Sequence, residues 1–103
     1  MSAEIAVADN PEAARFEITV DGALAGFAEY RLKDDRIVFT HTEIDPAFEG
    51  QGLGSRLAAA ALDASRDTGL TVVPRCPFIA RYIDRHPEYR SLLGGEEARG
   101  QEG

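Results

Sequence analysis

A glycine-rich segment at residues 49–55, Glu-Gly-Gln-Gly-Leu-Gly-Ser, limits the possible folds of this chain more than any other feature. It follows an apolar run that ends at Asp45-Pro46, and it leads directly into a helical pattern. Glycines at alternate positions allow positive φ angles and a close backbone approach, so that successive N–H groups can point at one anion. The dipole of the following helix adds to this attraction. The segment therefore predicts a phosphate-binding loop between a strand and a helix.

The spacing of the glycines separates this loop from the common nucleotide motifs. It lacks the Gly-Lys-Ser/Thr ending of a P-loop. It also differs from the Gly-x-Gly-x-x-Gly pattern of dinucleotide folds, because the third glycine comes one residue early and the preceding segments are typical of antiparallel hairpins. A different pyrophosphate-binding loop is favoured, and a tight turn with no ligand is the alternative.

The length and charge of the chain limit its partners. At 103 residues it forms one domain with one core. The formal net charge of −7 and the absence of a basic run argue against nucleic acid or an anionic membrane as a partner. The same charge favours a substrate that carries an amine.

The sequence also indicates the compartment of the protein. No apolar stretch reaches the roughly 20 residues of a membrane span, and no basic segment precedes an apolar block at the N-terminus, so we expect a cytoplasmic protein. The single cysteine, Cys76, excludes an internal disulfide, and with only His41 and His86 beside it no metal site is predicted. The excess of arginine over lysine is typical of a GC-rich bacterial genome.

The predicted domain covers residues 13–93, with a flexible N-terminus at 1–12 and a disordered tail at 94–103. Alternating apolar residues predict a strand at 15–20, followed by strands at about 24–32 and at 36–44. Three antiparallel strands therefore precede the loop. In the third strand, the period of two places the following residues on one face: Ile37, Phe39, His41 and Glu43.

The second half of the chain predicts a helix, a buried strand and another helix. The first helix spans residues 52–68, ends at Gly69, and carries an apolar stripe of Leu53, Leu57, Ala60, Ala61 and Ala64. A short buried strand at 70–73 follows, and Pro77 begins a helix that His86-Pro87 ends. The expected fold class is α/β (α+β), with a mixed, mainly antiparallel sheet, one helix after the loop and a second C-terminal helix.

In this order of elements, residues 36–90 resemble the GCN5-related N-acetyltransferase superfamily. More narrowly, His41-Thr42-Glu43-Ile44 before the loop and Cys76-Pro77-Phe78 after the last strand are similar to its small, truncated acetyltransferase-like branch. The resemblance implies the acyl-CoA N-acyltransferase fold, acetyl-CoA (coenzyme A) as cosubstrate, and acetyl transfer to an amine of an unknown acceptor. It further implies that the pyrophosphate and the adjoining arm are bound by Ile44, Gly50, Gln51, Gly52, Leu53, Gly54 and Ser55.

The chain departs from the family pattern at two positions. Glu49 stands where the superfamily usually has Arg or Gln, so a carboxylate lies near the anion site. In the later helix Ala80 fits the pattern, but Asp84 stands where a tyrosine near the thiol is usual. Tyr82 is the candidate substitute.

Three groups are candidates for chemistry. Cys76 precedes a helix and follows Arg75, so positive potential favours its thiolate, which could accept the acetyl group; a small buried hydrophobe is the alternative. His41 and Glu43 form a candidate base pair for an incoming ammonium, or a polar patch at a sheet edge. Phe78 and Tyr82 are expected against the pantetheine arm or adenine, or in the core.

Two other functions remain open from the sequence. The same fold could serve as a noncatalytic coenzyme A-binding or protein-interaction module, which the truncation and Glu49 favour. A small α/β interaction domain without a ligand is the third possibility. The expected assembly is a monomer or a weak homodimer through an edge strand.

Overall fold

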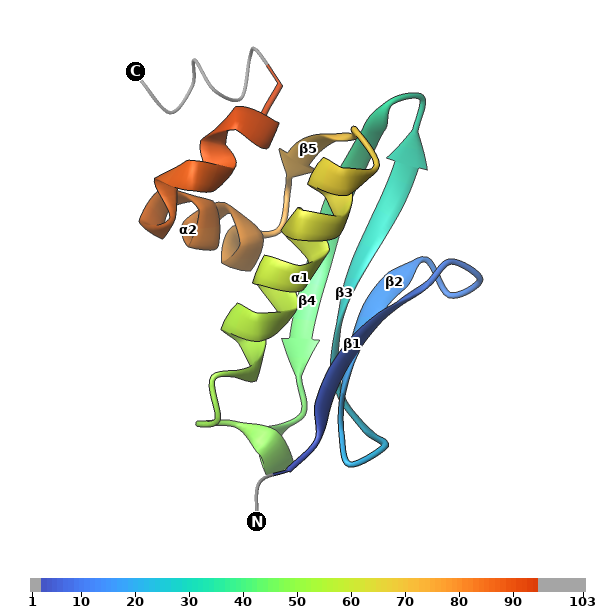
Figure 1. Ribbon diagram of the computed structural model, residues 1–103, viewed down its shortest axis with the longest axis vertical. Coiled ribbons are helices and arrows are strands. Elements are labelled where there is room, and N and C mark those ends of the chain that lie inside the picture. Colours follow the sequence, from blue (N-terminus) through green and yellow to red (C-terminus); the bar gives the residue numbers. More distant parts are fainter. Residues whose placement is uncertain (1–2, 95–103) are drawn as a thin grey trace.

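The computed structural model describes residues 3–94, which form one five-stranded sheet with helices packed on one face (Figure 1). The strands are β1 Ile5–Asn10, β2 Arg15–Val20, β3 Ala23–Lys33, β4 Arg36–Ile44 and β5 Thr71–Pro74. The helices are α1 Leu53–Asp67 and α2 Pro77–Arg85, with 3-10 helices at Pro46–Phe48 and Pro87–Leu92. The strands lie in chain order; β1 to β4 are antiparallel, and β5 pairs parallel to β4.

The N-terminal segment, predicted to be loose, contains a strand. β1 pairs with β2 along its whole length, and the Glu4 N–H donates to Asp21 Oδ1 at 2.9 Å. Its side chains alternate only weakly, with Ile5 and Val7 half-buried among small or polar neighbours. The strand depends on pairing with β2, and a period of two among such small residues is hard to detect. Four antiparallel strands therefore precede the loop instead of three, while the predicted tail lies, apart from Gly94, outside the described residues.

A β-bulge in β4 reverses the face predicted for two candidate residues. Tyr30 pairs with Phe39 and Glu29 with His41, so Thr40 is an extra residue on β4. Phe39 is buried against the helices, whereas the His41 and Glu43 side chains are 54% and 61% exposed. The prediction that both share a face with Phe39 is wrong, because one inserted residue changes the parity of the strand.

α1 packs on the sheet with a wider stripe than predicted. The buried residues of this helix are Leu53, Leu57, Ala58, Ala61, Leu62 and Ser65. Ala60 and Ala64, predicted in the core, are only half-buried. The centre of the stripe lies nearer to Ala58 and Leu62, because the twisted sheet determines which side of the helix faces it. Gly69 follows the helix with a φ of 75°, as expected for a glycine that ends a helix.

The helix α1 and the strand β5 form the predicted crossover. Val72 is fully buried beside β4. α2 then starts at Pro77 and packs Ile79 and Ile83 into the same core, and it ends before Pro87. In Figure 1, α1 crosses in front of β4, and α2 lies next to α1 on the side of β5. None of the helices within residues 3–94 is long and apolar enough to cross a membrane.

Candidate functional site

The sheet is open along one half of β4. The pairing of β4 with β5 ends at Phe39 and Pro74, and the Cys76 N–H donates to the Phe39 carbonyl oxygen at 2.9 Å. The chain then turns into α2. Within the described residues, the segment 40–44 therefore has β3 on one side and no strand on the other. This edge leads directly to the glycine loop.

The loop presents uncapped backbone N–H groups at the start of α1. Gly50 and Gly52 have φ angles of 86° and 73°, and Gly52 is the N-cap residue, with no side-chain hydrogen bond to the helix. The Arg56 N–H donates to the Gly52 carbonyl oxygen at 3.3 Å, so the preceding N–H groups of the first turn have no acceptor in the helix. Such a turn is suited to bind a phosphate group.

A pocket of about 300 Å³ lies over this loop. It contains most of the residues predicted to bind the cosubstrate: Ile44, Gly50, Gly52, Leu53, Gly54, Ser55 and Phe78. Glu49 and Phe48 also line it. Phe48 could not be predicted from the sequence, because it lies between Pro46 and the glycines and belongs to no motif. Gln51 is exposed in the loop and does not line the pocket. The pocket combines aromatic walls with free N–H groups, an arrangement suited to a ligand that carries a phosphate group on an apolar arm.

Gly54 has a packing role that differs from the role of the other loop glycines. A Cβ atom at Gly54 would lie 2.7 Å from Phe78 Cζ, whereas a Cβ at Gly50 or Gly52 would meet nothing within 4 Å. Gly54 therefore lets the Phe78 ring lie on the first turn of α1. Gly50 and Gly52 are needed for their positive φ angles.

Cys76 lies on the helix side of the sheet, next to the open edge of β4. It is 3% exposed and belongs to the hydrophobic core. Its thiol donates to Thr42 Oγ1 at 3.3 Å. The side chain is therefore covered, and it contacts β4 through Thr42, a residue of the His41–Ile44 segment to which the sequence assigned no role of its own.

His41 and Glu43 come together on the opposite, open face of the sheet. His41 Nε2 lies 3.1 Å from Glu43 Oε1, and the ring of Phe27 lies 6.1 Å from that of His41. The structure brings this pair together as predicted, but it does not bring the pair to Cys76, because Thr42 between them points to the helix side.

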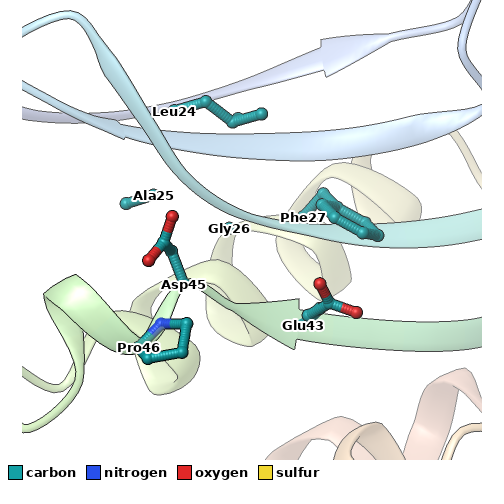
Figure 2. Close-up of a pocket in the computed structure, with 7 residues that line it drawn as sticks. All are labelled: Leu24, Ala25, Gly26, Phe27, Glu43, Asp45 and Pro46. Carbon is teal, nitrogen blue, oxygen red and sulfur yellow. The ribbon is translucent and has the colours of Figure 1, made fainter.

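A pocket of about 140 Å³ adjoins the His41–Glu43 pair, where the start of β3 pairs with the end of β4 (Figure 2). Its lining is apolar except for the carboxylates of Glu43 and Asp45: Leu24, Ala25, Gly26, Phe27 and Pro46. The Asp45 side chain also accepts a hydrogen bond from the Ala47 N–H at 2.9 Å. No motif marked Asp45 or Phe27, because the pocket forms only when the two strands pair.

Tyr82 lies one helical turn from Phe78 and lines a neighbouring pocket of about 100 Å³ instead of the loop pocket. Burial, with smaller contributions from the charges of Glu88 and Asp63, raises the pKa of Tyr82. The phenol therefore stays neutral and can donate a hydrogen bond at physiological pH.

Comparisons with known proteins agree with this geometry. The chain is 36% identical over 59 residues to the NATD1 proteins of chicken (Gallus gallus), mouse (Mus musculus) and human (Homo sapiens). The match covers 56% of this chain and 54% of the chicken and mouse proteins, so the chain spans about half the length of these curated relatives.

Two solved structures share the fold. A GCN5-like protein from Staphylococcus aureus superimposes with a TM-score of 0.65 at 23% identity, covering 89% of this chain and 88% of the other. The ribosomal-protein-alanine N-acetyltransferase of Brucella melitensis gives a TM-score of 0.58 at 15% identity, covering 92% and 93%. Both support the acyl-CoA N-acyltransferase fold for this sheet and its helices.

The family model described as GCN5-related N-acetyl-transferase matches residues 15–92, from the start of β2 to the end of the last 3-10 helix. That range contains the open edge of β4, the glycine loop and α2. The chain therefore belongs to the GCN5-related N-acetyltransferase family.

Proposed function

We propose that this protein transfers the acetyl group of acetyl-CoA to an amine. The observation that carries the proposal is the continuity of three features: the uncapped start of α1, the pocket of about 300 Å³ over the loop, and the open edge of β4 that leads from it. The pyrophosphate accepts hydrogen bonds from the N–H groups of the first turn of α1. The pantetheine arm then lies along residues 40–44 of β4.

The residues of β4 and its neighbours supply the proton chemistry. An ammonium group must lose a proton before its nitrogen can attack the thioester carbonyl. His41 accepts that proton, and Glu43, at 3.1 Å, stabilises the imidazolium that results. The new C–N bond forms as the C–S bond breaks, and the departing sulfur takes the second proton of the nitrogen, so that coenzyme A leaves as its thiol.

The pocket next to this pair suggests the class of acceptor. Its walls are apolar and its polar groups are the carboxylates of Glu43 and Asp45. An amine on an apolar stem matches both, and the net charge of −7 attracts such a cation. We propose a primary alkyl amine, free or at a protein side chain, as the acceptor.

Cys76 offers a second route, through an acetyl-cysteine intermediate. In this route the thiolate attacks the thioester, coenzyme A leaves, and the amine later displaces the cysteine sulfur. The burial of Cys76 at 3% exposure favours direct transfer over this route. Cys76→Ala separates them, because direct transfer retains turnover in the variant and the covalent route loses it.

The first test is a titration of acetyl-CoA, followed by amide NMR shifts of Gly50, Gly52 and Ser55. Saturable shifts in the loop support the proposal, and no shifts at millimolar ligand contradict it. Turnover is then measured as release of free thiol with a panel of alkyl amines. His41→Asn should lower turnover and leave acetyl-CoA binding unchanged, since the imidazole lies on the face opposite to the core.

A noncatalytic coenzyme A-binding module is the second candidate. The carboxylate of Glu49 in the lining of the loop pocket and the burial of Cys76 favour it. In that case the loop shifts would appear with acetyl-CoA and with free coenzyme A, but no amine would release thiol. Acetylation of Cys76, read by mass spectrometry, would argue against it.

A further inference from the structure

The face of the sheet opposite the helices carries charges of opposite sign at its two ends. On the helix side, Tyr30 pairs with Phe39 and both are buried. Leu32 pairs with Ile37 on the same side, since both line a pocket with residues of α1. Because side chains alternate along a strand, the residues next to these lie on the open face: Arg31, Lys33, Arg36 and Val38. Arg31, Lys33 and Arg36 form a cationic cluster at the β3–β4 hairpin, and Glu43 lies at the other end of β4.

The three cations of this cluster have no carboxylate partner among residues 3–94. The ion pairs of that part of the chain join other residues: Arg15 to Glu17, His41 to Glu43 and Arg66 to Asp63. Asp34 and Asp35 lie between β3 and β4, but neither forms an ion pair with the cluster. Lys33 and Arg36 pair directly across the two strands, where like charges repel each other. The cluster therefore does not stabilise the sheet, which indicates that it serves a contact with another molecule.

The cluster is also accessible, in contrast to the remaining cation of the strands. Arg15 lies 2.8 Å from a Glu17 carboxylate oxygen, and its guanidinium carbon lies 4.6 Å from the centre of the Phe27 ring. The residues of the cluster are exposed. The pairing of β2 with β3 ends at Glu29, so the β3–β4 hairpin extends past β2 (Figure 1). In the described part of the chain, no strand lies beside the cluster on that side.

The cluster lies at a defined distance from the pocket next to the His41–Glu43 pair. Phe27 lines that pocket and pairs with Glu43. At about 3.3 Å per residue, Arg31 lies roughly 13 Å and Lys33 roughly 20 Å from Phe27 along β3. An extended peptide has the same rise and presents every second side chain to one face. A peptide whose lysine enters the pocket therefore places its fourth and sixth residues from that lysine over the cluster.

The mixture of charges on this face favours a peptide over other anionic partners. Glu29 pairs with His41 between the cluster and the pocket, so a carboxylate interrupts the open face there. The continuous charge of a nucleic acid or an anionic membrane would meet Glu29 and Glu43 as well as the cluster. A peptide with one cation and with anions several residues away matches both ends of the face.

We propose that the cationic cluster docks an acidic segment of an acceptor protein, four to six residues from the lysine that receives the acetyl group. The ammonium lies by the carboxylates of Glu43 and Asp45, and the acidic side chains pair with the cluster. This inference rests on the proposed function, since it takes the pocket next to His41 as the acceptor site. It adds the sequence context by which one lysine is distinguished from another.

The test measures thiol release from acetyl-CoA with three peptides that each carry one central lysine. The first has glutamate at the fourth and sixth positions on both sides, so that the result does not depend on the direction of binding. The second is its isomer with glutamate at the third and fifth positions, which point away from the face. The third has glutamine at the fourth and sixth positions. The first should have a kcat/KM about fivefold above the others, from a few exposed ion pairs, and should lose this advantage in about 1 M salt.

Two variants and one control assign the preference to the cluster. The triple variant Arg31→Gln/Lys33→Gln/Arg36→Gln should lose the preference and keep its turnover of the glutamine peptide. Arg31→Gln alone should retain a smaller preference. Arg90→Gln, an exposed position on the 3-10 helix at Pro87–Leu92, makes the same charge change as Arg31→Gln and should keep the full preference.

The outcomes separate this inference from the proposed function. Turnover of alkyl amines with equal kcat/KM for the three peptides, or with no turnover of any peptide, overturns the inference and leaves the proposed function standing. A preference that persists in the triple variant also overturns it. Binding of a single-stranded oligonucleotide or an anionic lipid vesicle more tightly than the first peptide, lost in the triple variant, would assign the cluster to that partner instead. Thiol release with neither peptides nor alkyl amines overturns the proposed function, and the inference with it.

Discussion

Replacing Gly54 by alanine tests how α1 and α2 meet at the loop pocket. A Cβ atom at this position would lie 2.7 Å from Cζ and 3.3 Å from Cε1 of Phe78, far inside van der Waals contact. The Phe78 side chain is 39% exposed, so its ring can swing toward solvent instead of straining the backbone. The substitution therefore exchanges a helix-favouring methyl group for the contact between Phe78 and the first turn of α1.

The magnitude follows from these two opposing effects. Glycine to alanine in a helix gains up to about 1 kcal/mol. Burial of a phenylalanine contributes roughly 1.5–3 kcal/mol when complete, and displacement of the partly exposed Phe78 ring should lose about 1 kcal/mol of it. We expect Gly54→Ala alone to change the free energy of unfolding by less than about 0.5 kcal/mol. In a Phe78→Ala background, where no ring is displaced, the same change should stabilise the protein by close to 1 kcal/mol.

The double-mutant cycle is measured by urea unfolding of the four proteins, followed by circular dichroism. A coupling energy of about 1 kcal/mol between the two positions is expected. Gly54→Ala should also weaken the binding of acetyl-CoA, because the displaced Phe78 ring no longer forms a wall of the loop pocket. If Gly54→Ala stabilises both backgrounds equally, the Phe78 ring does not pack on Gly54, and the described contact between α1 and α2 is incorrect.

Three further predictions concern other parts of the structure. Gly26→Ala should destabilise the protein by about 1–3 kcal/mol in urea unfolding, because its Cβ atom would lie 2.6 Å from the backbone carbonyl oxygen of Glu43, which cannot move away. Unchanged stability would contradict the described pairing of β3 with β4. At Gly52 a Cβ atom would have open space, but the φ angle of 73° is unfavourable for alanine. Gly52→Ala should therefore lose about 1–2 kcal/mol of stability, and relaxation of the loop should weaken the binding of acetyl-CoA. Unchanged stability would show that this φ angle is not required. Burial and a hydrogen bond to Asp9 raise the pKa of Tyr30 to about 12. The Tyr30 phenol therefore keeps its proton to higher pH in the folded state than in the unfolded chain, and the stability of the protein should fall from about pH 10 toward pH 12. In thermal unfolding measured against pH, Tyr30→Phe should show a shallower decline, and an equal decline would refute the assignment.

The strength of local signals decided how far the fold was predictable. β4 was predicted at its observed bounds, and α1, β5 and α2 within one or two residues, because each has a strong period or a clear stop such as Gly69 or Pro87. β1 was not predicted, because the alternation among its small residues is weak and the strand is stabilised by its pairing with β2. The core stripe of α1 was off by one position, since the twist of the sheet selects the side of the helix that is buried.

The candidate site was predictable where it depends on backbone conformation. Glycine positions report directly on φ, so the loop and its position at the start of α1 followed from the residues alone. Gln51 and Tyr82 show the limit of this reasoning, since neighbours in the sequence or on one helix stripe need not line the same pocket.

The sequence by itself determined the order of elements from β2 to α2, the glycine loop before α1 and the resemblance to the family, because these depend on short-range spacing that each segment carries within itself. Only the tertiary structure decided which candidate residues share a surface. The single extra residue at Thr40 turned His41 and Glu43 away from Cys76, and the ending of the β4–β5 pairing at Phe39 opened the edge beside the loop. Both depend on strand pairing, in which one residue of register reverses every side chain beyond it, and no local pattern records that choice.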